Sequence, residues 1–275
     1  MELHSQTRAH RSIKLETGSK ELNAHTTFLV IGDVHGQWDC VIDAINSATD
    51  ILGHVPDLVL QVGDAEAIRS EEDLAAVHVP NKYRSMGLFS ALGPGDLKSP
   101  VYFIGGNHEP YEMLDEYQGD PPIKWGDNVF YLGRAGAATI HSLNIAWLSG
   151  IQRSVMLETR RPSKKERTYY LESEVELTKK NGSMLGDIDV VITHDWPIGI
   201  QGGRGTELIR SITEALQPQL HVCGHMHTHH EAVIGKTKLH ALNVVPPAGR
   251  GENRFGWWRL YRKELGAINC IWIGS

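Results

Sequence analysis

Five short apolar runs along the chain each end in a cluster of polar residues. The runs cover residues 27–31, 57–62, 101–104, 190–193 and 220–223. Apolar runs of this length predict strands that are buried on both faces of a sheet. Because open α/β sheets bind their ligands beyond the carboxyl ends of the strands, we expect the polar clusters to meet at one edge.

Other segments carry the periods of helices and of half-buried strands. Apolar residues recur at helical spacing in residues 38–52 and 208–216, and Pro218 closes the second segment. Residues 138–148 predict a hairpin that turns at residues 142–144, and further antiparallel strands are expected in 230–244 and 257–273. The pattern as a whole predicts an α/β fold, a two-sheet mixed β-sandwich flanked by helices.

The length and the loop signals favour a single domain. A chain of 275 residues can form one sizeable core, and none of the Gly- and Pro-rich loops resembles a domain boundary. Residues 1–25 are polar and mixed in charge, so we expect a flexible N-terminal leader, without a secretory signal, before a domain at 26–275. No apolar run is long enough to predict a membrane span.

Charge and cysteine content narrow the function classes. A formal net charge of −6 argues against a plain nucleic-acid-binding module, which is usually basic, but allows an enzyme whose metal ions attract phosphate. The three cysteines are odd in number and widely spaced, which suits a reducing compartment. We therefore expect a cytoplasmic protein.

The polar clusters combine carboxylate, imidazole and amide groups. They contain Asp33, His35, Asp64, Asn107, His108, His194, His225 and His227. Such donors suit Mn²⁺, Fe²⁺ or Zn²⁺. One Asp-x-His pair would mean little, but five clusters that each follow a predicted strand favour a site for two divalent metal ions. Ions about 3.5–4 Å apart can clamp the attacking and leaving oxygens of an in-line displacement and make hydroxide available at neutral pH.

The clusters read GDVHG, GD, GGNHE, THD and GHMH, and in this order they resemble the five signatures of the calcineurin-like metallophosphoesterases. The resemblance implies a four-layer sandwich and a dinuclear metal centre whose bridging hydroxide attacks phosphorus. It implies one ion on Asp33, His35 and His227, a second on Asn107, His194 and His225, and Asp64 between them. His108 would be the catalytic residue that stabilises the phosphate or protonates the leaving oxygen.

A narrower resemblance points to the RNA lariat debranching enzymes, which are 2′–5′ phosphodiesterases. GDAEAIRSEEDL, VPNKYRSM, NVFYLGRAG, LSGIQRS and THDWPIGI keep that family's order. Those enzymes typically carry cysteine at the position of Asp33, so the aspartate suggests a more general two-metal centre. The resemblance implies a phosphate-ester substrate, either RNA or a nucleotide. The sequence indicates no protein partner.

Two other functions remain as alternatives. GDVHGQ followed by Asp39 resembles the first motif of Ser/Thr protein phosphatases, which are phosphomonoesterases. Their second motif continues with Val-Asp-Arg-Gly, whereas residues 63–69 here read GDAEAIR. A non-enzymatic scaffold would normally have lost ligand positions, and this chain keeps every ligand type.

Basic residues outside the clusters are candidates for contact with the substrate. Positive charge concentrates in residues 153–167, where Tyr169 and Tyr170 follow, as single-stranded nucleic acid would require. A solvated charged loop is the alternative. The substrate-binding candidates are Arg69, Lys82, Arg84, Arg160 and Arg161, and surface salt bridges would explain each of them equally well.

Three residues near the clusters have structural alternatives. Asp195 either orients His194 from outside the metal site or caps the turn. We expect His229 and His230 to be structural or surface residues.

Overall fold

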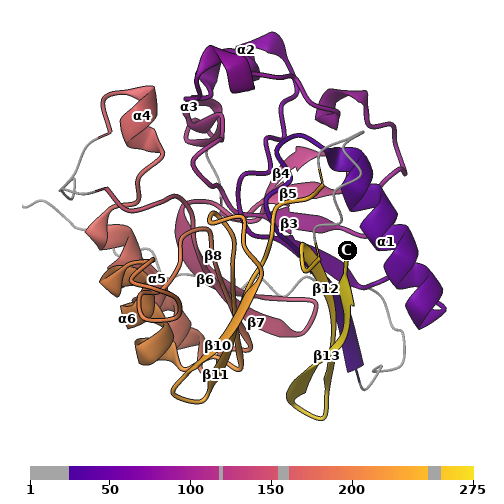
Figure 1. Ribbon diagram of the computed structural model, residues 1–275, viewed down its shortest axis with the longest axis vertical. Helices are drawn as coiled ribbons and strands as arrows, with labels where there is room; N and C mark the ends of the chain where they lie inside the picture. The colour runs from indigo at the N-terminus through magenta and orange to yellow at the C-terminus, as the bar shows by residue number, and fades with distance from the viewer. Residues whose placement is uncertain (1–24, 118–119, 154–160, 247–254) are drawn as a thin grey trace, which may run out of the picture.

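Two β-sheets stacked face to face form the centre of the computed structural model (Figure 1). The structure describes residues 25–117, 120–153, 161–246 and 255–275. The larger sheet has the order β13-β12-β1-β2-β3-β5-β4, with β1 (His25–Ile31), β2 (Leu58–Gln61), β3 (Val101–Phe103), β4 (Ile123–Gly126), β5 (Val129–Tyr131), β12 (Trp258–Glu264) and β13 (Ala267–Gly274). The smaller has the order β10-β11-β9-β8-β7-β6, with β6 (Ala135–Ile140), β7 (Leu143–Leu148), β8 (Val190–Thr193), β9 (Leu220–Cys223), β10 (His230–Ile234) and β11 (Thr237–Ala241).

Apolar side chains from both sheets fill the space between them. Phe28 and Leu60 project from the larger sheet, and Ile145, Ile192 and Val222 from the smaller one; all five are fully buried. Burial of each such side chain stabilises the fold by about 1.5–3 kcal/mol. The sandwich interior is therefore the apolar core that fixes the two sheets relative to each other.

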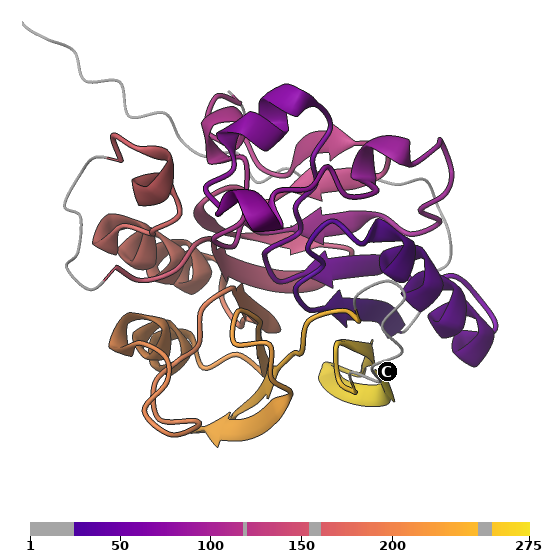
Figure 2. The ribbon, with the colours of Figure 1, turned by 45° about the horizontal axis from the view of Figure 1, so that its top comes forward.

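Helices cover the outer faces of the sandwich. They are α1 (Trp38–Leu52), α2 (Glu71–Ala76), α3 (Tyr111–Leu114), α4 (Lys164–Arg167), α5 (Glu172–Leu185) and α6 (Glu207–Leu216), with 3-10 turns at Asn81–Tyr83 and Phe89–Ala91. The helix α1 packs on the larger sheet and α5 and α6 on the smaller, so they lie on opposite sides of the molecule (Figure 2). The short α2, α3 and α4 gather beyond one end of the strands (Figure 1).

The helix α1 follows directly from its apolar spacing. Trp38, Val41, Ile45 and Ala48 recur at helical intervals, and all four are buried against the larger sheet. The helix ends at Gly53, whose left-handed backbone (φ 75°) lets its N–H bond to the carbonyl of Thr49.

Parallel pairing places several strand ends at the same edge. The strands β1, β2 and β3 run parallel in the larger sheet, as do β7, β8 and β9 in the smaller. The buried Gln61 side chain ties two of the loops beyond them, because its amide donates to the carbonyl oxygens of Gly32 (3.1 Å) and Gly63 (2.6 Å). The segments that follow β1, β2, β3, β8 and β9 therefore meet in one region.

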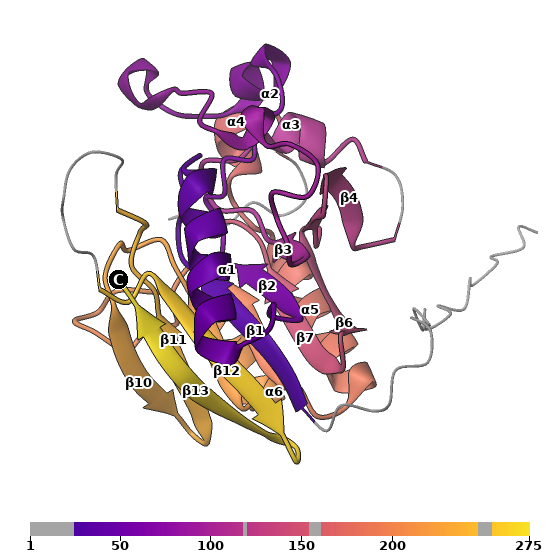
Figure 3. The same ribbon diagram turned by 90° about the vertical axis from the view of Figure 1, so that its right-hand side faces the viewer.

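At one side of the sandwich the β10–β11 hairpin lies beside the β12–β13 hairpin (Figure 3). Residues of both hairpins, including Lys238, His240, Arg259 and Trp272, line a cavity of about 600 Å³. This cavity is separate from the convergence of strand ends.

The observed architecture confirms the predicted two-sheet α/β sandwich, including the helix at residues 38–52. The β6–β7 hairpin turns slightly earlier in the chain than the predicted residues 142–144. The turn consists of His141 and Ser142, both with left-handed backbone (φ 46° and 69°), which matches the twist of a two-residue hairpin. Helix α5 was not predicted, because its buried face is small and mixed: Val175, Thr178 and Gly182.

The predicted leader at residues 1–25 lies almost wholly outside the described residues, which begin with His25 in β1. The leader and the single domain at 26–275 stay predictions. Among the helices in the described ranges, none has both the length and the apolar character needed to cross a membrane.

A buried histidine in β9 gives the fold a pH dependence. Thr193 Oγ1 donates to a carbonyl and so accepts from His221 Nε2 (2.9 Å), while Thr213 Oγ1 lies 2.8 Å from Nδ1, closer than the 3.4 Å to its other contact, the carbonyl of Ile209. Both contacts suit a neutral imidazole, and burial lowers the pKa of His221 to about 3. Because the unfolded chain binds a proton below its ordinary pKa of 6.5 and the folded chain does not, the free energy of unfolding falls as pH decreases below 6.5.

We expect this histidine to account for about 1–2 kcal/mol of the stability lost by metal-free protein between pH 6.5 and about pH 5. Urea unfolding at several pH values measures it. In His221→Gln the slope should be shallower, whereas the exposed control His54→Gln should keep the wild-type slope. Equal slopes in all three proteins would contradict the assignment.

Candidate metal centre

Two buried carboxylates lie in the loops after β1 and β2. The side chains of Asp33 and Asp64 are almost completely inaccessible to solvent. The loops are joined by the backbone, since the carbonyl of Asp64 accepts the N–H groups of Val34 (3.0 Å) and His35 (2.8 Å). Asp33 in turn accepts the backbone N–H of His225 on both oxygens, at 3.0 Å each.

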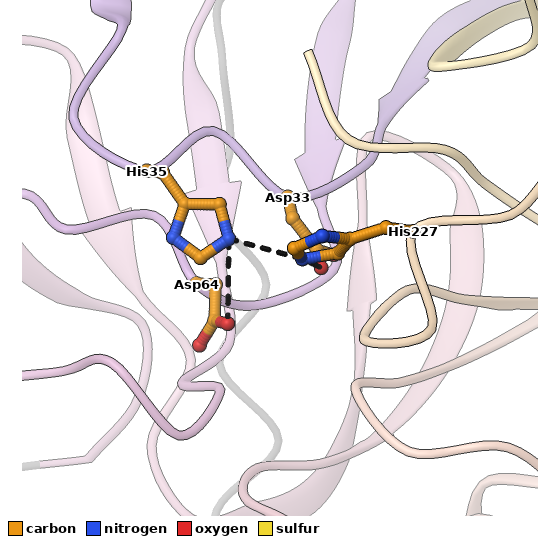
Figure 4. A group of neighbouring side chains, drawn as sticks. All are labelled: Asp33, His35, Asp64 and His227. Atoms are coloured by element: carbon orange, nitrogen blue, oxygen red, sulfur yellow. Dashed lines mark hydrogen bonds and ion pairs between the residues drawn. The ribbon is translucent and has the colours of Figure 1, made fainter. Parts of the chain in front are cut away.

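Four side chains from three loops point toward one another (Figure 4). They are Asp33, His35, Asp64 and His227, and their ligand atoms all lie within 4.8 Å of one another. His227 Nε2 is 3.1 Å from Asp33 Oδ2, and His35 Nε2 is 3.8 Å from Asp64 Oδ2. This group has the composition and spacing of a site for one divalent cation.

A second set of donors also lies close to Asp64. His194 Nε2 is 3.5 Å from Asp64 Oδ2 and 3.3 Å from Asn107 Oδ1. The ring of His225 packs beside that of His194, with 4.9 Å between the ring centroids. The structure thus brings every metal ligand predicted from the sequence into one region.

The carbonyl of Val62 orients His194 by accepting from Nδ1 at 2.9 Å. Asp195 does not take this role. Its carboxylate accepts the backbone N–H groups of Trp196 (2.9 Å) and Gln152 (3.0 Å), so it caps the turn, which was one of its two predicted roles.

Glu66 was not predicted from the sequence as a functional residue. Its Oε1 accepts from Nδ1 of His35 (3.0 Å) and from Nδ1 of His108 (2.9 Å), and the side chain is buried. One carboxylate thereby fixes the ring of a predicted metal ligand and the ring of the predicted catalytic residue. An acidic residue two positions after Asp64 was the available signal.

The loops carry an unusual concentration of left-handed backbone. His35, Asp64, Glu66, His225 and His227 all have positive φ angles, between 43° and 67°. Each such residue costs about 1–3 kcal/mol, which the surrounding hydrogen bonds must offset. Conformations of this kind cluster at functional sites because ordinary strand or helix geometry cannot aim the side chains inward.

Glycine is required where the loops approach most closely. A Cβ atom at Gly106 would overlap Asp64 Oδ1 and the backbone nitrogen of Asp64, and one at Gly224 would overlap Asp33 Oδ1. At these two positions the backbone therefore lies directly against the carboxylates.

The electrostatics of the site favour positive charge. Burial alone would lower the pKa of His194, but Asp64 and Asp33 outweigh it and raise the pKa to about 10. Burial would likewise lower the pKa of His35, but Glu66 and Asp64 outweigh this effect and raise the pKa to about 9. Burial would raise the pKa of Asp64, yet the neighbouring histidines hold it well below its usual range.

These observations fit bound divalent cations. The donors are carboxylate oxygen, amide oxygen and imidazole nitrogen, which suit Mn²⁺, Fe²⁺ and Zn²⁺. The site is also accessible, since the side chain of His227 is 44% exposed while Asp33 is buried. An open ligand side is typical of catalytic metal sites.

Two of the predicted substrate-binding residues are engaged within the protein. The Arg69 guanidinium forms two hydrogen bonds to the Asp73 carboxylate and stacks 3.5 Å from the centroid of the Trp125 ring. Arg161 is bound to Glu174 and to the carbonyl of Tyr169.

The other predicted contacts differ in their surroundings. Lys82 and Arg84 are exposed, and Lys82 lies over the ring of Tyr83. Arg160 lies outside the described residues. Substrate binding by all five residues stays a prediction.

Comparison with known proteins gives consistent matches. The sequence model of the calcineurin-like phosphoesterases matches residues 26–229. The chain is 29% identical over 235 residues to the lariat debranching enzyme of Drosophila melanogaster (74% of this chain, 43% of the relative) and 35% identical over 181 residues to that of Danio rerio (62% and 31%). It is 29% identical over 242 residues to that of Entamoeba histolytica (78% and 68%).

The match covers 43% and 48% of the Drosophila melanogaster and Caenorhabditis briggsae enzymes, so the chain spans about half the length of these relatives. Solved structures share the fold at low identity. TT1561 of Thermus thermophilus aligns with a TM-score of 0.57 at 12% identity, covering 89% of this chain and 97% of that one. GAP50 of Plasmodium aligns with a TM-score of 0.53 at 12% identity, covering 91% and 88%.

A methyl group at the closest approach of the loops should disrupt the site. We expect Gly106→Ala to weaken Mn²⁺ binding at least about tenfold, because the added Cβ displaces Asp64. Isothermal titration of metal-free protein measures the affinity. The matched control is Gly93→Ala, where a Cβ would meet Asp96 at an ordinary 3.5 Å. Wild-type affinity in Gly106→Ala would contradict the geometry.

Proposed function

The chain belongs to the calcineurin-like phosphoesterase family, hydrolases of phosphoesters, and on this premise we propose that it is a phosphodiesterase with a dinuclear metal centre. One observation carries the proposal. Asp64 Oδ2 lies 3.8 Å from Nε2 of His35 and 3.5 Å from Nε2 of His194, and these histidines belong to the two separate donor sets. A carboxylate in this position can serve two neighbouring ions.

Each ion has its own ligands in this proposal. Asp33, His35 and His227 would hold one ion, Asn107, His194 and His225 would hold the other, and Asp64 would be shared. When bound, two divalent ions supply Lewis acidity and lower the pKa of a water molecule, so that hydroxide is available near neutral pH.

His108 acts on the substrate without holding metal. Its backbone N–H donates to Asp64 Oδ1 at 2.8 Å, and its Nδ1 is bound to Glu66. Nε2 is therefore the nitrogen that remains to donate a hydrogen bond or a proton to the phosphate or to the leaving oxygen. Glu66 fixes the ring so that this nitrogen is presented in one orientation.

The proposed substrate is a phosphodiester of RNA or of a nucleotide. The similarity to lariat debranching enzymes over 62–78% of the chain supports this class. A cytoplasmic location is part of the proposal. It is supported by Cys40, Cys223 and Cys270, which are all free thiols in the structure.

The choice between diester and monoester is testable with two chromogenic substrates. With Mn²⁺ we expect a higher kcat/KM for a bis-aryl phosphodiester than for the matching aryl monophosphate. A phosphomonoesterase would show the reverse order and would refute the diester assignment. A panel of 2′–5′ branched, 3′–5′ linear and cyclic nucleotides, assayed with Mn²⁺, Fe²⁺ and Zn²⁺, then identifies the linkage.

His108→Ala tests whether His108 acts on the substrate without binding metal. We expect kcat to fall about 10²–10⁴-fold because the donor to the substrate is lost. Metal content should stay at the wild-type level, since the backbone N–H that binds Asp64 remains. Elemental analysis of the purified variant measures this, and loss of metal would show that His108 has a different role.

A further inference from the structure

The loop between β9 and β10 carries two of the proposed metal ligands, His225 and His227. Its beginning is fixed from two directions. Trp196 Nε1 donates to the carbonyl of Gly224 at 2.5 Å, and Asp33 accepts the N–H of His225. Both ligands have left-handed backbone, which a free loop would not maintain. The end of the loop must therefore be fixed as well.

Arg259 fixes the end of this loop from the opposite sheet. It stands in β12, and its side chain is 1% exposed. Nη2 donates to His229 Nε2 and to Glu231 Oε1, and Nη1 lies 3.2 Å from His240 Nδ1. One guanidinium thus contacts the residues two and four positions beyond His227, together with β11.

The surrounding contacts hold each partner in place. Glu231 is paired with His240 in the β10–β11 register, so Arg259 contacts both members of one cross-strand pair. Tyr261 Oη lies 2.6 Å from His240 Nδ1, and the ring of Phe255 packs edge-on against His229. A planar guanidinium with several fixed donors suits such a cluster, and a flexible ammonium would reach fewer acceptors.

We propose that Arg259 is a positioning residue that holds the β9–β10 loop so that His227 meets Asp33. The inference rests on the proposed metal-dependent function. Arg259 lies outside residues 26–229, the range matched by the family model, so it adds a contribution of the C-terminal strands to the site. Residues that orient metal ligands through such contacts typically change metal affinity about 10–100-fold when replaced.

The experiment compares variants of the full chain in metal-free form. Isothermal titration measures the Mn²⁺ affinity, and thermal unfolding without metal reports on the fold. We expect Arg259→Met to weaken Mn²⁺ binding at least about tenfold, and Arg259→Lys to recover part of the loss. The matched control is Arg262→Met in the same strand, because no hydrogen bond joins Arg262 to this loop within the described part of the chain. This variant should bind Mn²⁺ like the wild type.

Each outcome decides the proposal. Wild-type Mn²⁺ affinity in folded Arg259→Met overturns it, and so does an equal loss in Arg262→Met. If Arg259→Met does not fold, Glu231→Ala is decisive, since it removes an acceptor of Arg259 and this 53% exposed side chain can be changed without opening the core. Weaker Mn²⁺ binding in that variant supports the proposal, and unchanged binding refutes it.

The same measurements separate this inference from the proposed function. A wild-type protein that binds Mn²⁺ but hydrolyses no phosphodiester would refute the function and leave the comparison of affinities valid. A wild-type protein that hydrolyses the diester, with variants that bind Mn²⁺ normally, would refute only the role of Arg259. A wild-type protein that binds none of Mn²⁺, Fe²⁺ and Zn²⁺ would refute both.

Discussion

Two buried carboxylates impose the constraint on which the rest of the site depends. Asp33 and Asp64 are removed from water, and an uncompensated buried charge costs several kcal/mol. Positive charge and N–H donors must therefore surround them. The histidines, the backbone amides of His108 and His225, and the cations that the donors suit all meet this one requirement.

The topology makes the constraint possible to satisfy. Parallel strands of two different sheets end in one region, so donors that are far apart in sequence arrive from separate directions. Gln61 ties two of the loops together, and glycine at positions 106 and 224 lets backbone lie against the carboxylates. Directing so many side chains to one point requires loop residues with left-handed backbone, which is energetically unfavourable.

The sequence predicted the parts of the molecule whose signals are local. Motif residues after apolar runs predicted the proposed metal ligands, and helical spacing predicted α1. The role of Glu66 was not predicted, because it depends on two hydrogen bonds to residues 31 and 42 positions away. Arg69 pairs with Asp73 only four positions away, so that ion pair is a local contact. The pairing of Arg161 with Glu174, and that of Arg259 with the β9–β10 loop, arise from tertiary contacts that no local pattern encodes.

The hydrogen bonds from His194 to Val62 and from His225 to Asp33 each connect the smaller sheet with the larger one. The proposed metal centre therefore lies across the seam of the sandwich and involves both halves. A cation that binds only the folded chain adds to its stability in proportion to the logarithm of its concentration. Chelating buffers used during purification would thus weaken the contact between the two sheets. Yield and solubility, and not only catalysis, would then depend on the metal supply.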